Sequence, residues 1–119
     1  SRIYSSQDIE RWHINEMKSL LSRFSGVKFI FDDVKQKYYP VLRDAITSFR
    51  SKNEGKPLVV IDDTPFIDFD ILDYPVNDIE EIFLLKGSDA AIWGPKASNG
   101  IIVIITQRGK STKIEQKEE

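Results

Sequence analysis

The sequence predicts a small α+β domain, a mixed β-sheet with short helices. Three apolar runs rich in β-branched residues predict buried strands at Leu58–Ile61, at residues 82–85 and at residues 101–106. Segments with helical apolar spacing and capping residues precede and separate these runs. The length of 119 residues, with 40% hydrophobic and 30% charged residues, is that of one ordinary folded domain.

Composition excludes several classes of function. The chain has no cysteine, which removes disulfide frameworks, thiol nucleophiles and Cys-ligated metal centres. Its 17 Lys and Arg stand against 19 Asp and Glu, so no basic field exists to hold nucleic acid or an anionic membrane. The longest apolar run, residues 101–105, is far shorter than the ~20 residues of a membrane-spanning helix. We therefore expect no nucleic-acid binding and no direct membrane insertion of this segment.

Two short helices are expected near the N-terminus. Ser5 and Asp8 have the spacing of a capping box, which predicts a helix over residues 6–12. Asn15 has the position of the N-cap of a second helix, and Gly26 that of its C-terminal stop. The second helix would bury an apolar stripe at helical spacing, formed by Met17, Leu20, Leu21 and Phe24.

The next segment leaves an alternative open. Residues 27–31 are aromatic and β-branched and predict a strand, and the polar residues 32–37 predict a loop. In residues 40–50 the apolar residues recur at helical spacing, with Pro40 in place for a first helical turn. Residues 38–43 would also form a short strand, so both structures remain open here.

The central strand is expected to begin a hairpin. Composition makes residues 51–57 a surface loop before the Leu58–Ile61 strand. Residues 66–67 can pair back on that strand, and residues 68–75 are expected to be irregular.

Two helical turns are expected around the strand at residues 82–85. Asn77 is expected to cap one over residues 78–80. Ser88 is expected to cap another over residues 89–93, which Gly94 would end.

The C-terminal part combines a buried strand with a polar tail. Residues 101–105 show no polar alternation, which predicts a strand covered on both faces. Asn99–Gly100 predicts a tight turn into it. Residues 110–119 are mostly charged, so we divide the chain into a domain over residues 1–109 and a solvated tail or linker over residues 110–119.

Four sequence motifs in a fixed order carry a family resemblance. They are PLVVID at residues 57–62, NDIEEI at 77–82, LKGSDAAIWG at 85–94 and ASNGIIVIITQRG at 97–109. Each motif alone is only a strand with a turn, but their order and spacing together are specific. The chain resembles the plug domain of TonB-dependent outer-membrane receptors, above all the SusC/RagA-type nutrient receptors.

The resemblance assigns structural roles to the turn residues of these motifs. Gly87 and Gly94 end a strand and a helical turn, where a positive φ is often required. The residues that the family motif retains in this chain are Asp62, Gly87, Gly94, Asn99, Gly100 and Gly109.

The chain departs from the family pattern at three places. Asp63 stands where the family usually has glycine, which leaves the turn type of the hairpin open. Trp93 replaces a tyrosine. The family's IRIRG strand has its nearest counterpart at residues 41–44, and this resemblance favours a strand over residues 40–43 rather than a helix.

The resemblance also implies a function and partners. A plug of this family occludes the lumen of the β-barrel of the same receptor in the outer membrane, takes part in substrate uptake, and moves or partly unfolds when TonB pulls from the periplasm. SusC/RagA-like receptors would take up glycans or peptides with a surface lipoprotein partner. No TonB box and no barrel can be identified in these residues, so coupling and the pore are implied by the family alone.

Two other functions compete with the plug. One is a barrel-less, plug-like interaction module of a larger periplasmic or cell-surface protein, which the charged tail favours. The other is an accessory domain of a periplasmic enzyme. His13 is the single histidine, and the chain has neither a G-x-S-x-G elbow nor a phosphate-binding glycine loop. We therefore expect no enzyme, no cofactor and no transition-metal site.

Three charged residues are candidates for partner contacts. Arg43 and Arg108 would pair with acidic residues of a surrounding barrel wall, and Asp89 is a third candidate. Exposed arginines of small energetic value are an equal alternative.

Two residue groups could bind ligands, but each has a simpler use. Acidic residues could offer oxygens to calcium, although they lack the D-x-D-x-D-G spacing and suit turns and caps better. These are Asp62, Asp63, Asp68, Asp70, Asp73 and Asp78. Aromatic residues could stack on sugars, although packing in the core is favoured. These are Trp12, Tyr38, Tyr39 and Trp93.

Overall fold

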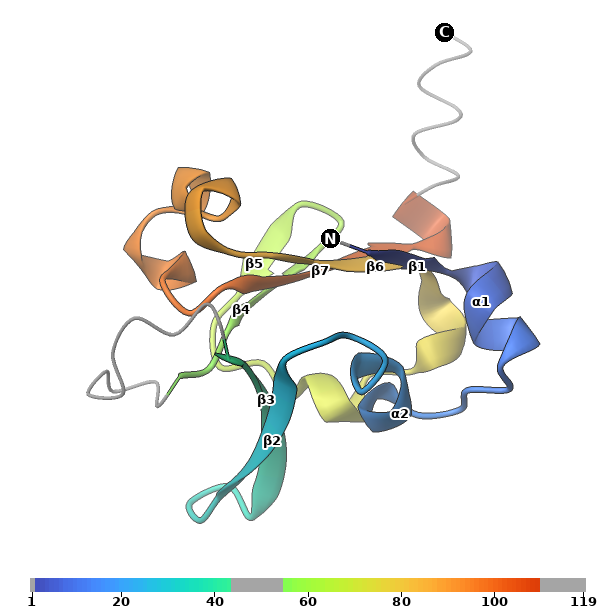
Figure 1. The fold of residues 1–119 in the computed structure, drawn as a ribbon, viewed down its shortest axis with the longest axis horizontal. Helices are drawn as coiled ribbons and strands as arrows, with labels where there is room; N and C mark the ends of the chain where they lie inside the picture. Colours follow the sequence, from blue (N-terminus) through green and yellow to red (C-terminus); the bar gives the residue numbers. More distant parts are fainter. Residues whose placement is uncertain (1, 44–54, 110–119) are drawn as a thin grey trace, which may run out of the picture.

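A computed structural model describes residues 2–43 and 55–109, and its centre is a five-stranded mixed sheet with strand order β1-β6-β7-β4-β5 (Figure 1). Strands β2 and β3 form a separate hairpin. The strands are β1 (Ile3–Ser5), β2 (Val27–Asp32), β3 (Lys37–Leu42), β4 (Leu58–Ile61), β5 (Thr64–Phe66), β6 (Ile79–Leu85) and β7 (Ile101–Thr106).

Strand β7 lies at the middle of the sheet and sets its mixed character. It pairs antiparallel with β6, with Ile82 opposite Ile104, and parallel with β4, with Val60 opposite Val103. Strands β1 and β5 complete the two ends by antiparallel pairing with β6 and β4. Both faces of β7 are covered, one by the main core and the other by the smaller core, which explains its run of β-branched residues.

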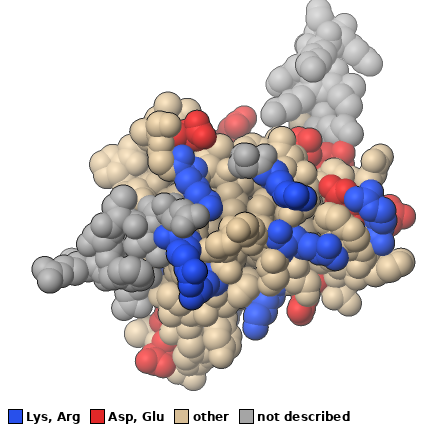
Figure 2. Space-filling view, viewed as in Figure 1, with Lys and Arg blue, Asp and Glu red and all other residues tan. Residues whose placement is uncertain are grey.

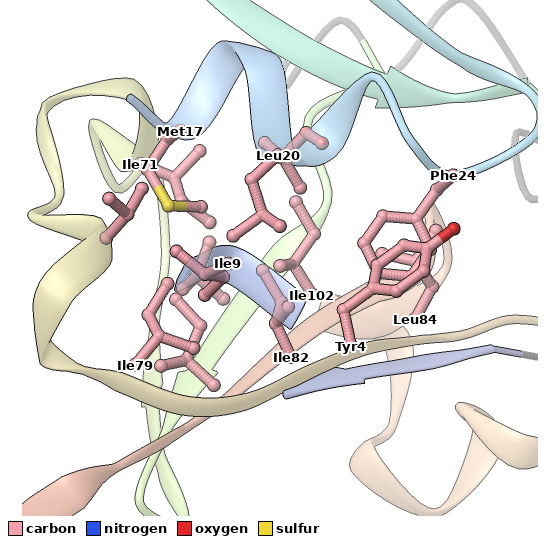
Figure 3. Packing of buried hydrophobic residues seen from close by; sticks show 14 of the residues in the cluster. Tyr4, Ile9, Met17, Leu20, Phe24, Ile71, Ile79, Ile82, Leu84 and Ile102 are labelled. Carbon is pink, nitrogen blue, oxygen red and sulfur yellow. The ribbon is translucent and has the colours of Figure 1, made fainter. Parts of the chain in front are cut away.

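One face of the sheet holds the main core. Helices α1 (Ser6–Arg11) and α2 (Met17–Leu21) and the 3₁₀ turn η2 (Ile71–Asp73) cover it (Figures 1 and 3). Fully buried side chains of α2 and η2 face those of β6 and β7. They are Met17, Leu20, Leu21, Ile71, Ile79, Ile82, Ile102 and Ile104. Each such side chain contributes roughly 1.5–3 kcal/mol by leaving water, before conformational entropy is counted.

The opposite face has a smaller core beneath three 3₁₀ turns. They are η4 (Gly87–Asp89), η5 (Ala91–Trp93) and η6 (Pro95–Ala97), drawn in orange in Figure 1. Ala90 and Ala97 are buried against Leu58, Val60 and Ile101. Small side chains at these positions let the turns lie close to the sheet.

The β2–β3 hairpin projects from the side of the molecule that carries α2 (Figure 1). Its register places Phe31 opposite Tyr38 and Val27 opposite Leu42. The end near the sheet is buried at Leu42, whereas Phe31 and Tyr38 toward the tip are exposed. The hairpin is therefore anchored at its base.

Several expectations from the sequence are confirmed. The three apolar runs form β4, β6 and β7. The expected hairpin on β4 is also present, but its second strand β5 covers residues 64–66 rather than 66–67, so Ile67 lies outside it. Ser5 and Asp8 form a complete capping box on α1. Ile102 and Ile104 lie in the main core and Ile101 in the smaller one, so β7 is covered on both faces. The favoured strand at residues 40–43 is confirmed over residues 40–42, which belong to β3, and Arg43 follows the strand.

Other expectations about caps and element ends are wrong. The N-cap of α2 is Glu16 rather than Asn15, and α2 ends at Leu21, five residues before the positive-φ Gly26. Ser88 lies inside η4 and makes no capping hydrogen bond. Ile79 and Glu80 begin β6, so the helical turn expected at residues 78–80 is instead the preceding 3₁₀ turn η3 (Val76–Asp78). At residues 79 and 80, the pairing of β6 with β7 overrides the local capping preference.

The loop expected at residues 32–37 is shorter in the structure. Asp32 pairs with Lys37 at the ends of β2 and β3, because aromatic and β-branched residues on both sides extend the ladder. Residues 44–50 of the helix-or-strand alternative and the tail at residues 110–119 lie outside the described residues. No helix within the described ranges is long and apolar enough to cross a membrane.

Candidate functional site

The turn that joins β4 to β5 is built from two aspartates. Asp62 has φ of 47° and Asp63 has φ of 69°. Two successive residues in the left-handed region form the tight hairpin turn whose twist matches that of the flanking strands. Asp63 therefore adopts the conformation for which the family uses glycine, and aspartate is one of the few other residues that tolerate it.

Asp62 also ties the end of β4 to the end of β7. Its carboxylate accepts a hydrogen bond from the backbone N–H of Thr106 at 2.9 Å and another from the Thr106 hydroxyl. The backbone N–H of Gly109 donates to the Thr106 hydroxyl oxygen at 3.0 Å. A Cβ on residue 109 would overlap the Asp62 carboxylate. The first and last of the four motifs thus meet in one hydrogen-bonded cluster.

The remaining motif residues shape the turns over the smaller core. Gly87, Gly94 and Gly100 have φ of 57°, 78° and 88°. Asn99 is buried, and its amide group donates to the backbone carbonyl of Lys56 at 3.3 Å. The motif residues therefore act as structural ties at the loop ends.

A second polar cluster holds the β2–β3 hairpin to the rest of the domain. The Lys56 ammonium group lies 2.7 Å from the Asp32 carboxylate in β2 and 2.9 Å from the Asp68 carboxylate after β5. It also lies 4.8 Å from the ring centroid of Tyr39. The Lys56 and Asp32 side chains are only 17% and 12% exposed, so solvent screens this pair poorly.

Two more lysines extend this cluster along the hairpin. The Lys35 ammonium group lies 3.1 Å from the carboxylates of both Asp68 and Asp70. The Lys37 ammonium group lies 2.7 Å from Asp73 and 3.5 Å from Asp70. We call the three lysines with Asp32, Asp68, Asp70 and Asp73 the hairpin clamp. It joins segments that lie far apart in the sequence.

The hairpin clamp shifts the pKa values of its three lysines and of Asp32, Asp68 and Asp70 toward the charged forms. Burial alone would lower the pKa of Lys56, but its hydrogen bonds to Asp32 and Asp68 outweigh burial and raise the pKa to about 12. The hydrogen bond from Lys56 is the main cause that lowers the pKa values of Asp32 and Asp68. The hydrogen bond from Lys35 does the same for Asp70.

The clamp accounts for three of the six acidic residues that the sequence singled out. Asp68, Asp70 and Asp73 face lysines, Asp62 and Asp63 form the β4–β5 turn, and Asp78 accepts a hydrogen bond from the Tyr74 hydroxyl at 2.6 Å. Across residues 2–43 and 55–109, no group of His, Cys, Asp or Glu has the arrangement of a metal site. The prediction that these aspartates serve in turns is confirmed for Asp62 and Asp63. The sequence did not predict the ion pairs of Asp68, Asp70 and Asp73 with lysines.

The three predicted partner contacts lie apart in the structure. Arg43 follows β3, is exposed, and its backbone N–H donates to the carbonyl of Gly26 at 3.0 Å. Arg108 follows β7 with its side chain 86% exposed and lies 3.9 Å from Asp78. Asp89 ends η4 and is exposed. Their role toward a partner stays a prediction.

The aromatic residues do not gather into one ligand platform either. Tyr39 is buried beneath Lys56, whereas Tyr38 is exposed and forms an edge contact with Phe31 at 5.1 Å between ring centroids. Trp12 packs against the main core and Trp93 against the smaller one. Three of the four aromatic side chains, Trp12, Tyr39 and Trp93, therefore pack within the domain.

The sequence alone did not reveal the hairpin clamp. Two aspartates followed by two lysines within residues 32–37 were a partial signal of a charged hairpin end. Nothing local connects that segment with Lys56 or with Asp68, because their meeting depends on how the hairpin docks.

Fold and turn cluster together define a small mixed-sheet domain whose loop ends are tied by an Asp–Thr–Gly cluster and whose exposed surface is charged. The chain matches the family described as TonB-dependent Receptor Plug Domain over residues 1–101. It belongs to this plug family.

Solved structures with the same fold include several siderophore receptors. PirA from Acinetobacter baumannii has a TM-score of 0.67 and 20% identity, over 89% of this chain and 17% of that chain. A mutant ferric enterobactin receptor PfeA from Pseudomonas aeruginosa, in complex with enterobactin, has a TM-score of 0.66 and 19% identity, over 88% of this chain and 17% of that chain. PirA from Pseudomonas aeruginosa has a TM-score of 0.55 and 23% identity, over 90% of this chain and 18% of that chain. The chain thus spans less than a fifth of the length of these receptors.

Proposed function

We propose that this domain is the gate of a TonB-dependent outer-membrane receptor. It would occlude the lumen of the receptor's own β-barrel and open a path when TonB acts from the periplasm. The observation that carries the proposal is the match to the plug family over residues 1–101, supported by the shared fold of the siderophore-receptor plugs. We place the domain at residues 1–109 and treat residues 110–119 as a linker.

The surface of the domain suits a position inside such a barrel. The interiors of large outer-membrane barrels are polar, and a charged folded domain can fill them. Arg43, Arg108 and Asp89 are exposed and stand apart on the surface. They could therefore meet opposite charges at several places on a surrounding wall. The role of the domain in the receptor would be mechanical, and the domain itself would catalyse no reaction.

The four motifs, taken together in their order and spacing, favour a receptor of the SusC/RagA type. We infer from them a glycan or peptide substrate and a surface lipoprotein partner. The siderophore receptors that share the fold are 19–23% identical and support the fold alone.

Conductance of the whole receptor tests the gate. The receptor that contains this segment would be purified intact and with residues 1–109 deleted, and each form inserted into planar lipid bilayers. We expect the intact receptor to conduct little and the deletion to produce large, stable pores. Circular dichroism of both forms would control for an intact barrel.

Two results would contradict the proposal. If both forms conduct alike, the domain does not occlude the pore. If the gene encodes no barrel beyond this segment, the alternative of a barrel-less interaction module replaces the gate. Substrate uptake in cells with and without TonB would test the coupling separately.

A further inference from the structure

A cationic hollow lies at the sheet edge formed by β1. Of the four sequence motifs, only the one at residues 85–94 contributes to its lining, through Lys86 and Asp89. Its cavity volume is about 710 Å³, and it opens between β1, the ends of α1 and α2, and the end of β6. Its charged lining consists of Arg2, Arg23 and Lys86 with one acid, Asp89. In the view shared by Figures 1 and 2, Lys and Arg side chains extend across the middle of the molecule, and Asp and Glu lie mostly toward its rim.

Two of the cations in this hollow have unused hydrogen-bonding capacity. Among the described residues, no acidic side chain forms an ion pair with Arg2 or Arg23. An arginine presents five N–H donors in a planar fork that matches a carboxylate. The hollow is therefore suited to an anionic ligand.

Arg23 is held in place for such a contact. Its guanidinium carbon lies 4.0 Å from the ring centroid of Trp12, which is a close cation–π contact. The Tyr4 hydroxyl donates to the backbone carbonyl of Arg23 at 2.8 Å, and the Tyr4 and Trp12 rings meet edge to face at 5.4 Å. A side chain fixed in this way loses little entropy when it binds a ligand.

The hollow borders a free strand edge. Strand β1 ends the sheet and pairs with β6, and no other described strand pairs with its outer edge. Ile3 in this strand is 57% exposed. An edge strand offers backbone N–H and C=O groups to an incoming extended chain.

We propose that this edge binds an extended acidic polypeptide segment, which adds a strand to β1 and places carboxylates against Arg2 and Arg23. The strand edge supplies backbone hydrogen bonds, and the hollow supplies charge selection through alternate side chains. The arginines are exposed, so a free inorganic anion would compete with water for them and bind weakly. A polypeptide combines both sets of contacts and is favoured over a small anion.

Peptide binding to the 119-residue chain tests this inference. The probe is a decapeptide of alternating Glu and Val, and its matched control has every Glu replaced by Gln. Isothermal titration at low salt should show at least tenfold tighter binding of the Glu peptide. The variant R2Q/R23Q should lose at least tenfold of that affinity.

R11Q serves as the matched control, because Arg11 also contacts Trp12 but pairs with Asp8 outside the hollow. It should change the affinity less than twofold.

Three outcomes would overturn the proposal. They are equal binding of the Glu and Gln peptides, unchanged binding by R2Q/R23Q, and binding of inorganic phosphate as tight as that of the Glu peptide. Hydrogen exchange adds a readout of the strand pairing, since the amide of Ile3 should become more protected when the peptide is bound. The Ser5 N–H already donates to the Asp8 carboxylate and serves as an internal reference. If this protection does not increase at Ile3, the peptide does not add a strand to β1. Thermal unfolding of each variant verifies that it is folded.

Discussion

The carboxylate of Asp62 occupies the space that a Cβ atom on Gly109 would need. Gly109 does not have a positive φ, so its requirement for glycine is steric rather than conformational. The carboxylate cannot move aside freely, because Thr106 holds it through its backbone N–H and its hydroxyl. The relationship connects the hairpin turn after β4 with the residues that follow β7.

Replacement of Gly109 by alanine should therefore destabilise the domain. We expect G109A to lower the free energy of unfolding by about 1–3 kcal/mol, as other substitutions that overfill a packed site do. Urea unfolding followed by circular dichroism measures this difference.

A double-mutant cycle separates this clash from other effects. In a D62A background the same glycine-to-alanine change should be neutral or slightly stabilising, because it only restricts the unfolded chain. An equal loss of stability in both backgrounds would show that Asp62 is not the cause.

Lys56 is the centre of the hairpin clamp, so its removal should loosen the β2–β3 hairpin. K56M leaves the poorly exposed Asp32 carboxylate without its closest cation. We expect a loss of about 1–2 kcal/mol in unfolding free energy at low salt, and a smaller loss at 1 M salt. The matched control is K28M, since Lys28 is exposed on the same hairpin and forms no ion pair with a described residue. The same loss in K28M would contradict a specific role of Lys56.

The clamp also predicts how stability depends on pH. The pKa values of Asp32, Asp68 and Asp70 are lowered in the folded state, chiefly by hydrogen bonds from Lys56 and Lys35. Their contribution is fully present above the unfolded value of about 3.9, and it is lost as the pH falls through the lower folded values. At the alkaline end, the contribution of Lys56 is lost as the pH rises from about 10.4 through its raised pKa of about 12.

Unfolding experiments on the wild-type chain and K56M across this range measure the effect. The stability difference between them should be largest between about pH 6 and 9 and shrink as the pH falls below about 3.9 through the lowered pKa values of the aspartates. A difference that stays constant throughout the acid range in which the domain remains folded would show that Lys56 stabilises the domain by packing rather than by charge.

Local patterns predicted the elements whose causes are local. The capping box of Ser5 and Asp8, the apolar run of β7 and the hairpin after β4 depend on neighbouring residues, and the structure contains all three. Asn15 and Ser88 had the right residue types for caps, yet α2 begins one residue later, after Glu16, and Ser88 lies inside η4. At Ile79 the boundary depends on a distant segment, because β6 pairs with β7 from that residue on.

The polar clusters are harder to predict for the same reason. Asp62 and Gly109 were identified through their motifs, but their contact needs β4 and β7 to be parallel neighbours. Lys56 was part of a segment predicted only as a surface loop. Its partners lie in β2 and after β5, which no periodicity connects.

Gly94 and Gly87 both have a positive φ, but they should tolerate alanine differently. Gly94 has φ of 78° and ψ of −165°, a region that is essentially restricted to glycine. Gly87 has φ of 57°, which lies in the left-handed helical range that other residues visit at a smaller cost. A Cβ at either position would meet no atom within 4 Å, so backbone strain alone separates them. We expect G94A to lower the unfolding free energy by about 2–3 kcal/mol and G87A by about 1 kcal/mol. Thermal and urea unfolding of the two variants measure this order, and a larger loss in G87A would refute strain at Gly94 as the reason for its glycine.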